Sequence, residues 1–305
     1  MDKIKLGQLE MLVAAVDAGS FSAAALELDC TQSRISHSIA ELERCVGARL
    51  LVRSRAGCVA TDTGRQVLLK ARQMLRLAQS IVNLGEEDAT VTGHVRVACF
   101  RSVGTHLLPF ALEALARDYP GIQVDVNNGC VDYEEVVNAV EQGVADLGIT
   151  RADDEDHLLH YPLAHDAYVC VVPAAAKLRS PLTWEQLAGM PFIHAQNAGS
   201  KRILDACRAD GFKPSSSRKW ASDSGVLAMV SRGMGFTITP QLAIFPMPKS
   251  VKILDLPFVA KRHISMIAQP EANRAKAFKI VTKLIRDKKI LKLTDAFRAG
   301  VIGLD

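Results

Sequence analysis

The sequence lacks the features that mark secreted and membrane-spanning proteins. Its 305 residues include seven cysteines, an odd number without any Cys-x-x-Cys spacing, which favours buried thiols in a reducing compartment over a disulfide framework. The first residues, MDKIKLGQLEML, lack the basic-then-apolar pattern of a signal peptide. No apolar run approaches the ~18 residues that span a bilayer. We therefore expect a cytoplasmic protein.

Familiar catalytic motifs are also missing. The chain has no phosphate-binding glycine loop, no Gly-x-Ser-x-Gly and no His-Glu-x-x-His. The one gathering of potential metal ligands is His157 and His160 with Asp153, Asp154 and Asp156, and its loose spacing in a polar segment is more typical of a solvated loop. We therefore expect no enzyme activity, no cofactor and no resident metal.

What the chain does contain is enough apolar material for two or three globular domains, with hydrophobic residues at 49% and charged residues at 23%. The formal net charge is only +4, but the charges are unevenly placed. Residues 104–166 hold thirteen Asp or Glu against two Arg, whereas residues 261–298 hold eleven basic residues against three acidic ones. The acidic block is unsuited to nucleic acid.

The stretch from Gly19 to Gly64 predicts two short helices joined by a tight turn. Ser20 is a candidate N-cap for a helix whose apolar residues recur at helical spacing, and Thr31 is a second candidate N-cap. The helix after Thr31 buries a face of Ile35, Ile39, Leu42 and Val46 and ends at Gly47. Two such helices form a helix-turn-helix unit.

The other face of the second helix carries groups that suit the base edges and phosphates of a major groove. These candidate DNA-binding residues are Thr31, Gln32, Ser33, Arg34, Ser36, His37 and Ser38. Arg34 could contact a guanine or a phosphate. The helices alone fit an ordinary helical hairpin with a solvated polar face equally well.

The segment after Gly47 favours DNA. Residues 50–52 and 59–61 predict a two-stranded wing with Arg53 and Arg55 near its tip, and both are candidate DNA contacts. Nine Lys or Arg against three Asp or Glu between residues 31 and 76 form a localised basic surface. We therefore predict a DNA-binding domain over residues 1–63.

The order Gly-Ser-Phe-Ser, Ala-Ala, Leu, Thr-Gln-Ser, Ile-Ser, Ile, Leu-Glu, Gly, Leu-Leu, Arg, Arg, Thr, Gly resembles the winged helix of the LysR-type transcriptional regulators. About twenty positions match at the right spacing over some sixty residues. Departures from the pattern affect which bases are read, and they fall at Arg34, His37, Ser38, Leu51 and Ala60.

Residues 64–88 predict a long linker helix. Leu68, Ala71, Leu75, Ala78 and Val82 follow alternating three- and four-residue steps, as in a coiled-coil seam. The seam either lies buried in its own domain or pairs with a second copy, and we favour dimerisation, which the resemblance also implies. A twofold dimer would read an inverted repeat with half-sites ~34 Å apart.

From residue 93 the pattern alternates strands with helices, ending in a helix over 275–285, and predicts parallel α/β sheets. We expect two α/β lobes, lobe I over 93–165 and 270–305 and lobe II over 166–269. This order resembles the periplasmic-binding-protein-like effector domain that follows LysR-type winged helices. The resemblance implies a homotetramer through contacts between effector domains and, in an activator, contact with RNA polymerase.

Ligands in open α/β sheets bind beyond the carboxyl ends of strands, near helix N-termini. Ser102, predicted to cap the helix after the first strand, and five further residues at such places are candidate effector contacts, although each also fits a simple cap or loop role. The six are Ser102, Thr105, Cys130, Thr150, His194 and Ser200.

We hypothesise a small carboxylate or other anion as the effector, with Arg101, Arg151 and Lys201 as candidate counter-charges. Two other functions fit parts of the sequence. A solute-binding module without DNA function is disfavoured by the winged helix, and an enzyme is disfavoured by the missing catalytic motifs. The sequence therefore predicts a DNA-binding transcriptional regulator with a small-molecule effector.

Overall fold

The computed structural model describes residues 3–54, 57–82, 91–151, 157–195, 199–220, 222–270, 272 and 275–304. The chain divides into two compact units, which we describe separately: residues 1–89 with 141–144, and residues 90–140 with 145–305. Over the described ranges, no single helix is long and apolar enough to cross a membrane. The helices Leu6–Asp17 and Phe21–Glu27 reach that length and composition only as a pair, and they are bent by 119° at their junction.

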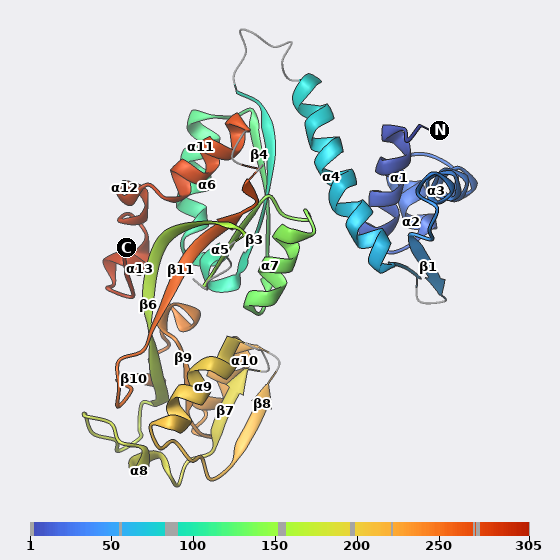
Figure 1. Cartoon of the computed structure of the whole chain (residues 1–305). Helices are drawn as coiled ribbons and strands as arrows, with labels where there is room; N and C mark the ends of the chain where they lie inside the picture. Colours follow the sequence, from blue (N-terminus) through green and yellow to red (C-terminus); the bar gives the residue numbers. More distant parts are fainter. Residues whose placement is uncertain are drawn as a thin grey trace. The chain divides into compact units, whose positions relative to one another are not determined.

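Helices α1 (Leu6–Asp17), α2 (Phe21–Glu27) and α3 (Gln32–Val46) pack around the core of the first unit (Figure 1). Leu12, Ile35 and Leu42 are fully buried in it. Both predicted caps are confirmed, because the Ser20 hydroxyl accepts the N–H of Ala23 and the Thr31 hydroxyl accepts the N–H of Arg34. The helix-turn-helix therefore follows from local signals in the sequence.

The predicted wing is confirmed as an antiparallel pair, β1 (Leu51–Ser54) and β2 (Gly57–Ala60), with Val52 opposite Val59. Helix α4 (Asp62–Val82) starts just after it. Gly64, in the first turn of α4, donates its N–H to the Thr61 hydroxyl at 2.9 Å. A Cβ at Gly64 would lie closer than 3.0 Å to the carbonyl of Leu50, so the start of α4 touches the backbone that leads into the wing.

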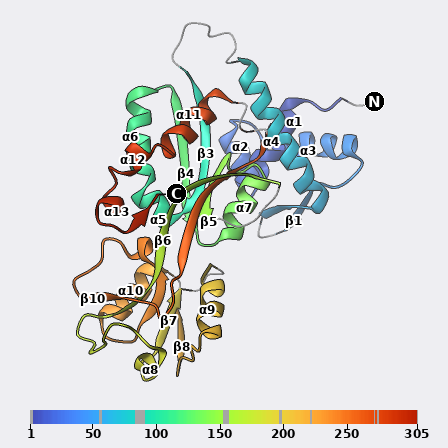
Figure 2. The same ribbon diagram turned by 60° about the vertical axis from the view of Figure 1, so that its left-hand side comes forward.

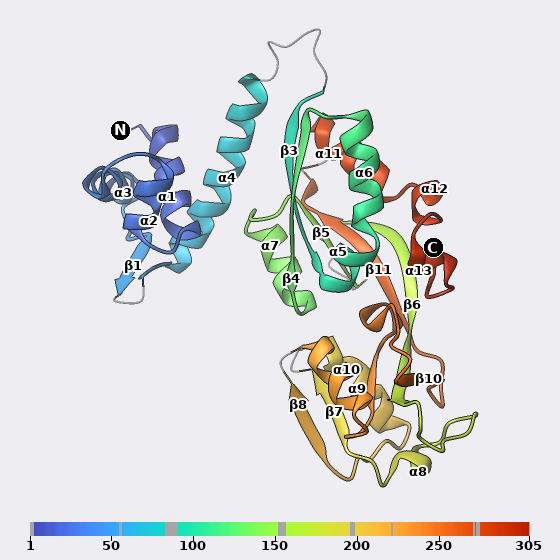
Figure 3. The ribbon, with the colours of Figure 1, turned by 180° about the vertical axis from the view of Figure 1, so that it is seen from behind.

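The second unit is built on a sheet of eight strands with the order β10-β6-β11-β5-β3-β4, and β9 and β12 also pair with β6. Strands β3 (Gly93–Phe100), β4 (Ile122–Cys130) and β5 (Leu147–Arg151) are parallel, as predicted. Helix α5 (Arg101–His106) leads into α6 (Leu108–Asp118), which covers one face of these strands, while α7 (Tyr133–Glu141) covers the other (Figure 3).

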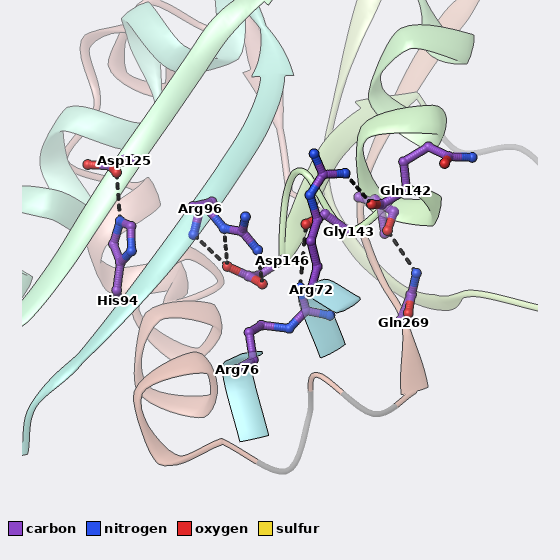
Figure 4. A network of polar contacts seen from close by, with 10 residues as sticks. Arg72, Arg76, His94, Arg96, Asp125, Gln142, Gly143, Asp146 and Gln269 are labelled. Atoms are coloured by element: carbon purple, nitrogen blue, oxygen red, sulfur yellow. Dashed lines mark hydrogen bonds and ion pairs between the residues drawn. The ribbon is translucent and has the colours of Figure 1, made fainter. Parts of the chain in front are cut away.

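Polar side chains tie these layers together. Arg96 donates from Nε and Nη2 to the carboxylate of Asp146 at 3.2 and 3.0 Å, which joins β3 to the start of β5 (Figure 4). His94 lies 2.6 Å from Asp125 across β3 and β4, and Gln269 donates to the carbonyl of Val140 at 2.9 Å.

Strand β6 (Leu159–Pro173) is long and, like β11 (Lys261–Ala268), runs through the second unit. All partners of β6 run antiparallel to it: β11, β9 (Thr237–Pro240), β10 (Val251–Asp255) and β12 (Ile302–Gly303). The expectation of parallel sheets throughout is wrong here. Pro162, His165 and Asp166 interrupt the apolar pattern of β6, so the sequence does not mark its 15 residues as one continuous strand.

The far end of the second unit holds β7 (Phe192–Ala195) and β8 (Ser217–Trp220), which are parallel, with α8 (Trp184–Leu187), α9 (Gly199–Ala209) and α10 (Asp223–Ser231) (Figure 2). The short 3₁₀ helix Gln241–Ile244 contacts both α5 and α10. At the carboxyl end, α11 (Lys276–Ile285) matches the predicted last helix. The structure adds α12 (Lys288–Leu291), α13 (Asp295–Arg298) and β12 beyond it.

All seven cysteines are free thiols. Five are buried, whereas Cys30, just before α3, and Cys45, in the last turn of α3, are half-buried. Burial raises the pKa of Cys99, Cys170 and Cys207 to about 12 each. These three thiols stay protonated at neutral pH and behave as small core residues.

Candidate functional site

The first turns of α3 form a polar surface. Asp29, at φ 46°, closes the turn after α2, and Thr31 then starts α3. Ile35, Ile39 and Leu42 anchor the opposite face in the core of the first unit. Burial of this apolar stripe fixes which side chains of α3 face outward.

The structure brings the seven candidate residues of α3 together on this surface. Thr31, Gln32, Ser33, Arg34 and His37 are exposed, whereas Ser36 and Ser38 are half-buried. The hydroxyls of Thr31 and Ser33 lie 3.0 Å apart. The surface thus offers amide, hydroxyl and guanidinium groups beside the N-terminus of a helix, where backbone N–H groups and the helix dipole favour phosphate.

His37 is held by its own helix. Its Nε2 lies 3.3 Å from Glu41, one turn further along, and the same carboxylate accepts a hydrogen bond from Gln8 of α1 at 3.1 Å. The His37 side chain itself stays 77% exposed. Of the two wing residues, Arg53 belongs to β1 but its side chain lies outside the described residues, and Arg55 lies outside them altogether.

Helix α4 divides into two halves by burial. Leu68 and Ala71, at the start of the predicted seam, are buried in the core of the first unit. Met74, Leu77 and Ile81 are exposed at 46%, 65% and 67%. An apolar face therefore remains exposed on the second half of α4. Its residues each precede a residue of the predicted seam by one position, so the exposed face is adjacent to the seam.

A cavity of about 110 Å³ lies in the second unit between the carboxyl ends of β3, β4 and β5, the start of α10 and the strand β9. Two of the predicted effector contacts, Ser102 and Cys130, line it, as do the predicted counter-charges Arg101 and Arg151. Its volume is below the ~150 Å³ of a cavity that holds benzene, so it suits a ligand of a few heavy atoms.

Ser102 reaches the cavity in a different way from the one expected. The prediction that it caps the helix after β3 is wrong, because Phe100 occupies the N-cap position and α5 already begins at Arg101. Ser102 is therefore inside the helix, and its side chain is 8% exposed. The helix starts earlier because β3 passes into α5 without an intervening loop.

Of the remaining predicted contacts, Thr105, Thr150 and His194 do not line this cavity. Thr105 is exposed on α5, and Thr150 is fully buried in β5 with its hydroxyl oxygen lacking a hydrogen-bond partner among the described residues. His194 in β7 stacks on Phe192 with ring centroids 5.3 Å apart. Ser200 belongs to α9, but its side chain lies outside the described residues. The candidate counter-charge Lys201 is exposed elsewhere on α9.

Several lining residues escaped the sequence analysis. Further polar residues of the cavity wall are Tyr168, Ser222, Asp223, Thr237, Thr239 and Arg262. A signal existed for two of them, because Asp223 follows a serine that caps a helix and Arg262 is a charged residue near the start of a strand whose later residues are mostly apolar. Nothing local indicates that residues so far apart in sequence share one cavity.

The cavity wall carries more positive than negative charge. Arg262 is buried and forms two hydrogen bonds with fully buried Asp166, at 2.8 and 2.9 Å. Burial lowers the pKa of Arg262, but the Asp166 carboxylate outweighs this and raises it overall. Arg101, Arg151 and Arg262 against Asp166 and Asp223 leave one net positive charge, and this arrangement favours a monoanion.

Among the described residues that line the cavity, Asp223 is the one with a carboxylate. Burial raises the pKa of Asp223 above its ordinary value of 3.8, and the positive charges of Arg262 and Arg101 partly oppose that rise. The carboxyl group is thus easier to protonate than an exposed aspartate.

Neither thiol chemistry nor metal binding finds support at the cavity. Burial, followed by the charges of Glu135 and Asp132, raises the pKa of the Cys130 thiol. Within the described ranges, no group of three or more His, Cys, Asp or Glu could hold a metal ion. His157 is exposed and His160 half-buried, and the three aspartates expected near them lie outside the described residues.

Two family models match the chain. The first, described as a bacterial regulatory helix-turn-helix protein of the lysR family, matches residues 6–65. The second, described as a LysR substrate binding domain, matches residues 88–289. A relative, the probable HTH-type transcriptional regulator LrrA of Synechococcus elongatus, is 36% identical over 266 residues, which cover 86% of this chain and 89% of that protein.

Solved structures share the fold. A full-length OxyR variant from Pseudomonas aeruginosa superposes with a TM-score of 0.74 at 19% identity, over 96% of this chain and 98% of that one. Full-length LysG from Corynebacterium glutamicum with bound effector Arg gives 0.62 at 22% identity, over 93% and 97% of the two chains.

Proposed function

Because the chain belongs to the LysR family of bacterial helix-turn-helix transcriptional regulators, we propose that α3 reads operator DNA and that the cavity of the second unit senses a small anion. The family assignment makes the chain a DNA-binding regulator with an effector-binding domain. We further propose that it acts in the cytoplasm by binding alone, without catalysis.

The observation that carries the DNA assignment is the polar surface of α3. Gln32, Ser33 and Arg34 are exposed in the first turn of a helix whose other face is anchored in a core. A recognition helix of a helix-turn-helix places its N-terminal residues against base edges in the major groove. We assign base contacts to this first turn, and phosphate contacts to Thr31, the later serines, His37, Arg53 and Arg55.

The uncovered face of α4 supports dimerisation. Met74, Leu77 and Ile81 occur at steps of three and four residues on one side of the helix, as in a paired helix. A second copy of α4 would cover them and relate two α3 helices by a twofold axis. The operator would then contain two half-sites ~34 Å apart. Tetramer formation and contact with RNA polymerase are proposed from family membership alone.

Replacing Arg34 by alanine should weaken specific DNA binding by about 5- to 150-fold, the loss of ~1–3 kcal/mol expected for a bidentate guanine contact. Fluorescence anisotropy with the full-length protein and the DNA upstream of its own gene measures the affinity. Footprinting of the same complex gives the half-site spacing, and circular dichroism establishes that the variant is folded.

Arg44 provides a matched control. It is an exposed arginine in the last turn of the same helix, ten residues or ~15 Å from Arg34. Arg44→Ala should change the affinity much less than Arg34→Ala. Equal losses from both variants would reduce Arg34 to a general electrostatic role, and a folded wild-type protein without a salt-sensitive, sequence-specific complex would overturn the DNA assignment.

The effector class follows from the cavity. It is small, it carries one net positive charge, and its polar wall includes guanidinium and hydroxyl groups that suit a carboxylate. The structure of LysG holds arginine, which bears a carboxylate, in a related fold. We propose a small monoanionic carboxylate that contacts Arg101, Arg151 and Ser102.

Asp223→Asn should tighten binding of such an anion about tenfold, because the carboxylate repels it across a partly buried site. In the unchanged protein, an anion that stays ionised, such as a small alkyl sulfonate, should bind more tightly as the pH falls. Protonation of Asp223 begins above the ordinary range because its pKa is raised, and it removes the opposing charge. Calorimetry at about pH 7 and about pH 5 measures both effects.

The asparagine variant should bind equally well at both pH values. Asp295→Asn is the matched control, since Asp295 is an exposed aspartate at the same first position of a helix, α13, and does not line the cavity. It should leave affinity and pH dependence unchanged. If Asp223→Asn weakens the binding of every anion tested, the effector instead presents a hydrogen-bond donor to Asp223.

A further inference from the structure

Helices α11 and α12 carry an unusual concentration of positive charge that neither the winged helix nor the cavity uses. We call it the basic strip, and it comprises Lys276, Lys279, Lys283, Arg286, Lys288, Lys289 and Lys292. The only acidic residue between its ends is Asp287. Its carboxylate caps α12 by accepting the N–H of Lys289 at 2.7 Å. All seven basic residues are exposed.

The strip is continuous because of helical periodicity. Lys276, Lys279, Lys283 and Arg286 fall within about 80° of arc on the outer side of α11. The opposite side buries Phe278, Val281 and Ile285 against α6 and β3 in the core of the second unit. Packing of the apolar face therefore leaves the basic face toward solvent.

Within the described part of the chain, no carboxylate forms an ion pair with any of the seven cations. Arg286 lies over the ring of Tyr161, with its guanidinium carbon 4.9 Å from the centroid, and this contact leaves its charge intact. On neighbouring α6, Asp118 is already engaged by Arg117. The strip is thus a concentrated, uncompensated field of one sign.

The chemistry of the strip fits a regular polyanion better than a protein. Protein interfaces depend on buried aromatic and apolar anchors, whereas no large apolar side chain is exposed between residues 276 and 292. The four cations of α11 extend over ten residues, ~15 Å, a length over which duplex DNA presents about nine phosphate charges.

We propose that the basic strip binds the phosphate backbone of DNA that flanks the sequence read by α3. The proposal rests on the proposed function, because the winged helix supplies the DNA. Once α3 is bound, the flanking duplex is tethered to the same chain, and attraction that is weak in isolation becomes effective. The strip would add affinity and salt dependence without reading sequence.

The test compares two full-length variants of equal charge on two DNA fragments. Lys279→Gln, Lys283→Gln and Lys288→Gln together remove three charges from the strip and keep good helix formers. The matched control replaces Lys177, Lys213 and Lys249 by glutamine, which are exposed lysines of the second unit outside the strip. One fragment contains only the protected operator, and the other extends it by about two helical turns on each side.

The unchanged protein should bind the long fragment more tightly than the short one and with a steeper dependence on salt. The salt dependence is the slope of the logarithm of the binding constant against the logarithm of the salt concentration. On the long fragment, this slope should be shallower for the strip variant by up to about 2.7, which is about 0.9 for each lost phosphate contact. On the short fragment it should match the control, which should behave as the unchanged protein on both.

Three results would overturn the proposal. The first is an equal salt slope for the strip variant and the control on the long fragment, and the second is an equal loss of affinity by the strip variant on both fragments. The third is unchanged DNA binding by the strip variant together with lost transcription in a reconstituted assay. The last result would identify an acidic protein partner. Failure of the proposed function looks different, because a protein that does not read operator DNA binds neither fragment specifically. Arg34→Ala should weaken binding to both fragments and keep the length-dependent slope.

Discussion

Replacing Arg262 by methionine should lower the free energy of unfolding of the second unit by about 3–5 kcal/mol. The change leaves Asp166 as a fully buried carboxylate that keeps, within the described part of the chain, only the N–H of Leu242 at 2.9 Å as a hydrogen-bond donor. An unpaired charge in a low-dielectric core costs far more than the lost contact itself. Both tryptophans, Trp184 and Trp220, belong to the second unit, so denaturant unfolding followed by tryptophan fluorescence reports on it directly.

Two further variants separate charge from packing. Arg117→Met breaks the exposed pair with Asp118 and should leave the unfolding midpoint unchanged. Asp166→Leu combined with Arg262→Met leaves no buried charge, and such replacements are often neutral. The double variant should therefore recover much of the stability that Arg262→Met loses. If it is as unstable as the single variant, packing of the arginine side chain dominates instead.

Replacing Gly64 by alanine should destabilise the first unit by about 1–3 kcal/mol and weaken DNA binding. The new Cβ would lie closer than 3.0 Å to the Leu50 carbonyl. That carbonyl oxygen cannot move away freely, since it accepts the N–H of Thr61 at 2.9 Å. The start of α4 must therefore shift relative to the wing. Far-UV circular dichroism follows the helices of both units, and the tryptophan signal identifies the transition of the second unit, so the remaining transition reports on the first unit. Anisotropy measures the DNA affinity.

Gly7 offers the matched control, because it is a glycine in α1 at which an added Cβ would meet no heavy atom within 4 Å. Gly7→Ala should be neutral or stabilise the helix by up to about 1 kcal/mol. The tryptophan transition of the second unit should be the same in both variants. A Gly64→Ala protein that melts and binds DNA like Gly7→Ala would mean that the junction between wing and α4 yields easily.

The winged helix could be predicted because its signals are local. Ser20 and Thr31 cap the helices that follow them, and Gly47 adopts φ 76° at the end of α3. Each needs only its immediate neighbours to act. The residues of α3 that face outward follow in turn from the apolar stripe of Ile35, Ile39 and Leu42.

The second unit was harder to predict where its structure depends on distant partners. Strand β8, Ser-Arg-Lys-Trp, is exposed along its whole length, so no apolar alternation marks it. Asp166 and Arg262 are neighbours across β6 and β11 although 96 positions separate them. The cavity combines such residues with the ends of β3 and β4, and only the strand ends could be predicted from sequence.

The burial of five cysteines makes the other two useful for spectroscopy. Cys30 and Cys45 are the half-buried thiols, and they lie immediately before and near the end of α3. A maleimide dye should therefore label the natural protein selectively at the two ends of α3, the helix proposed to read DNA. The chain carries its own attachment points for following DNA engagement by fluorescence, without any added cysteine.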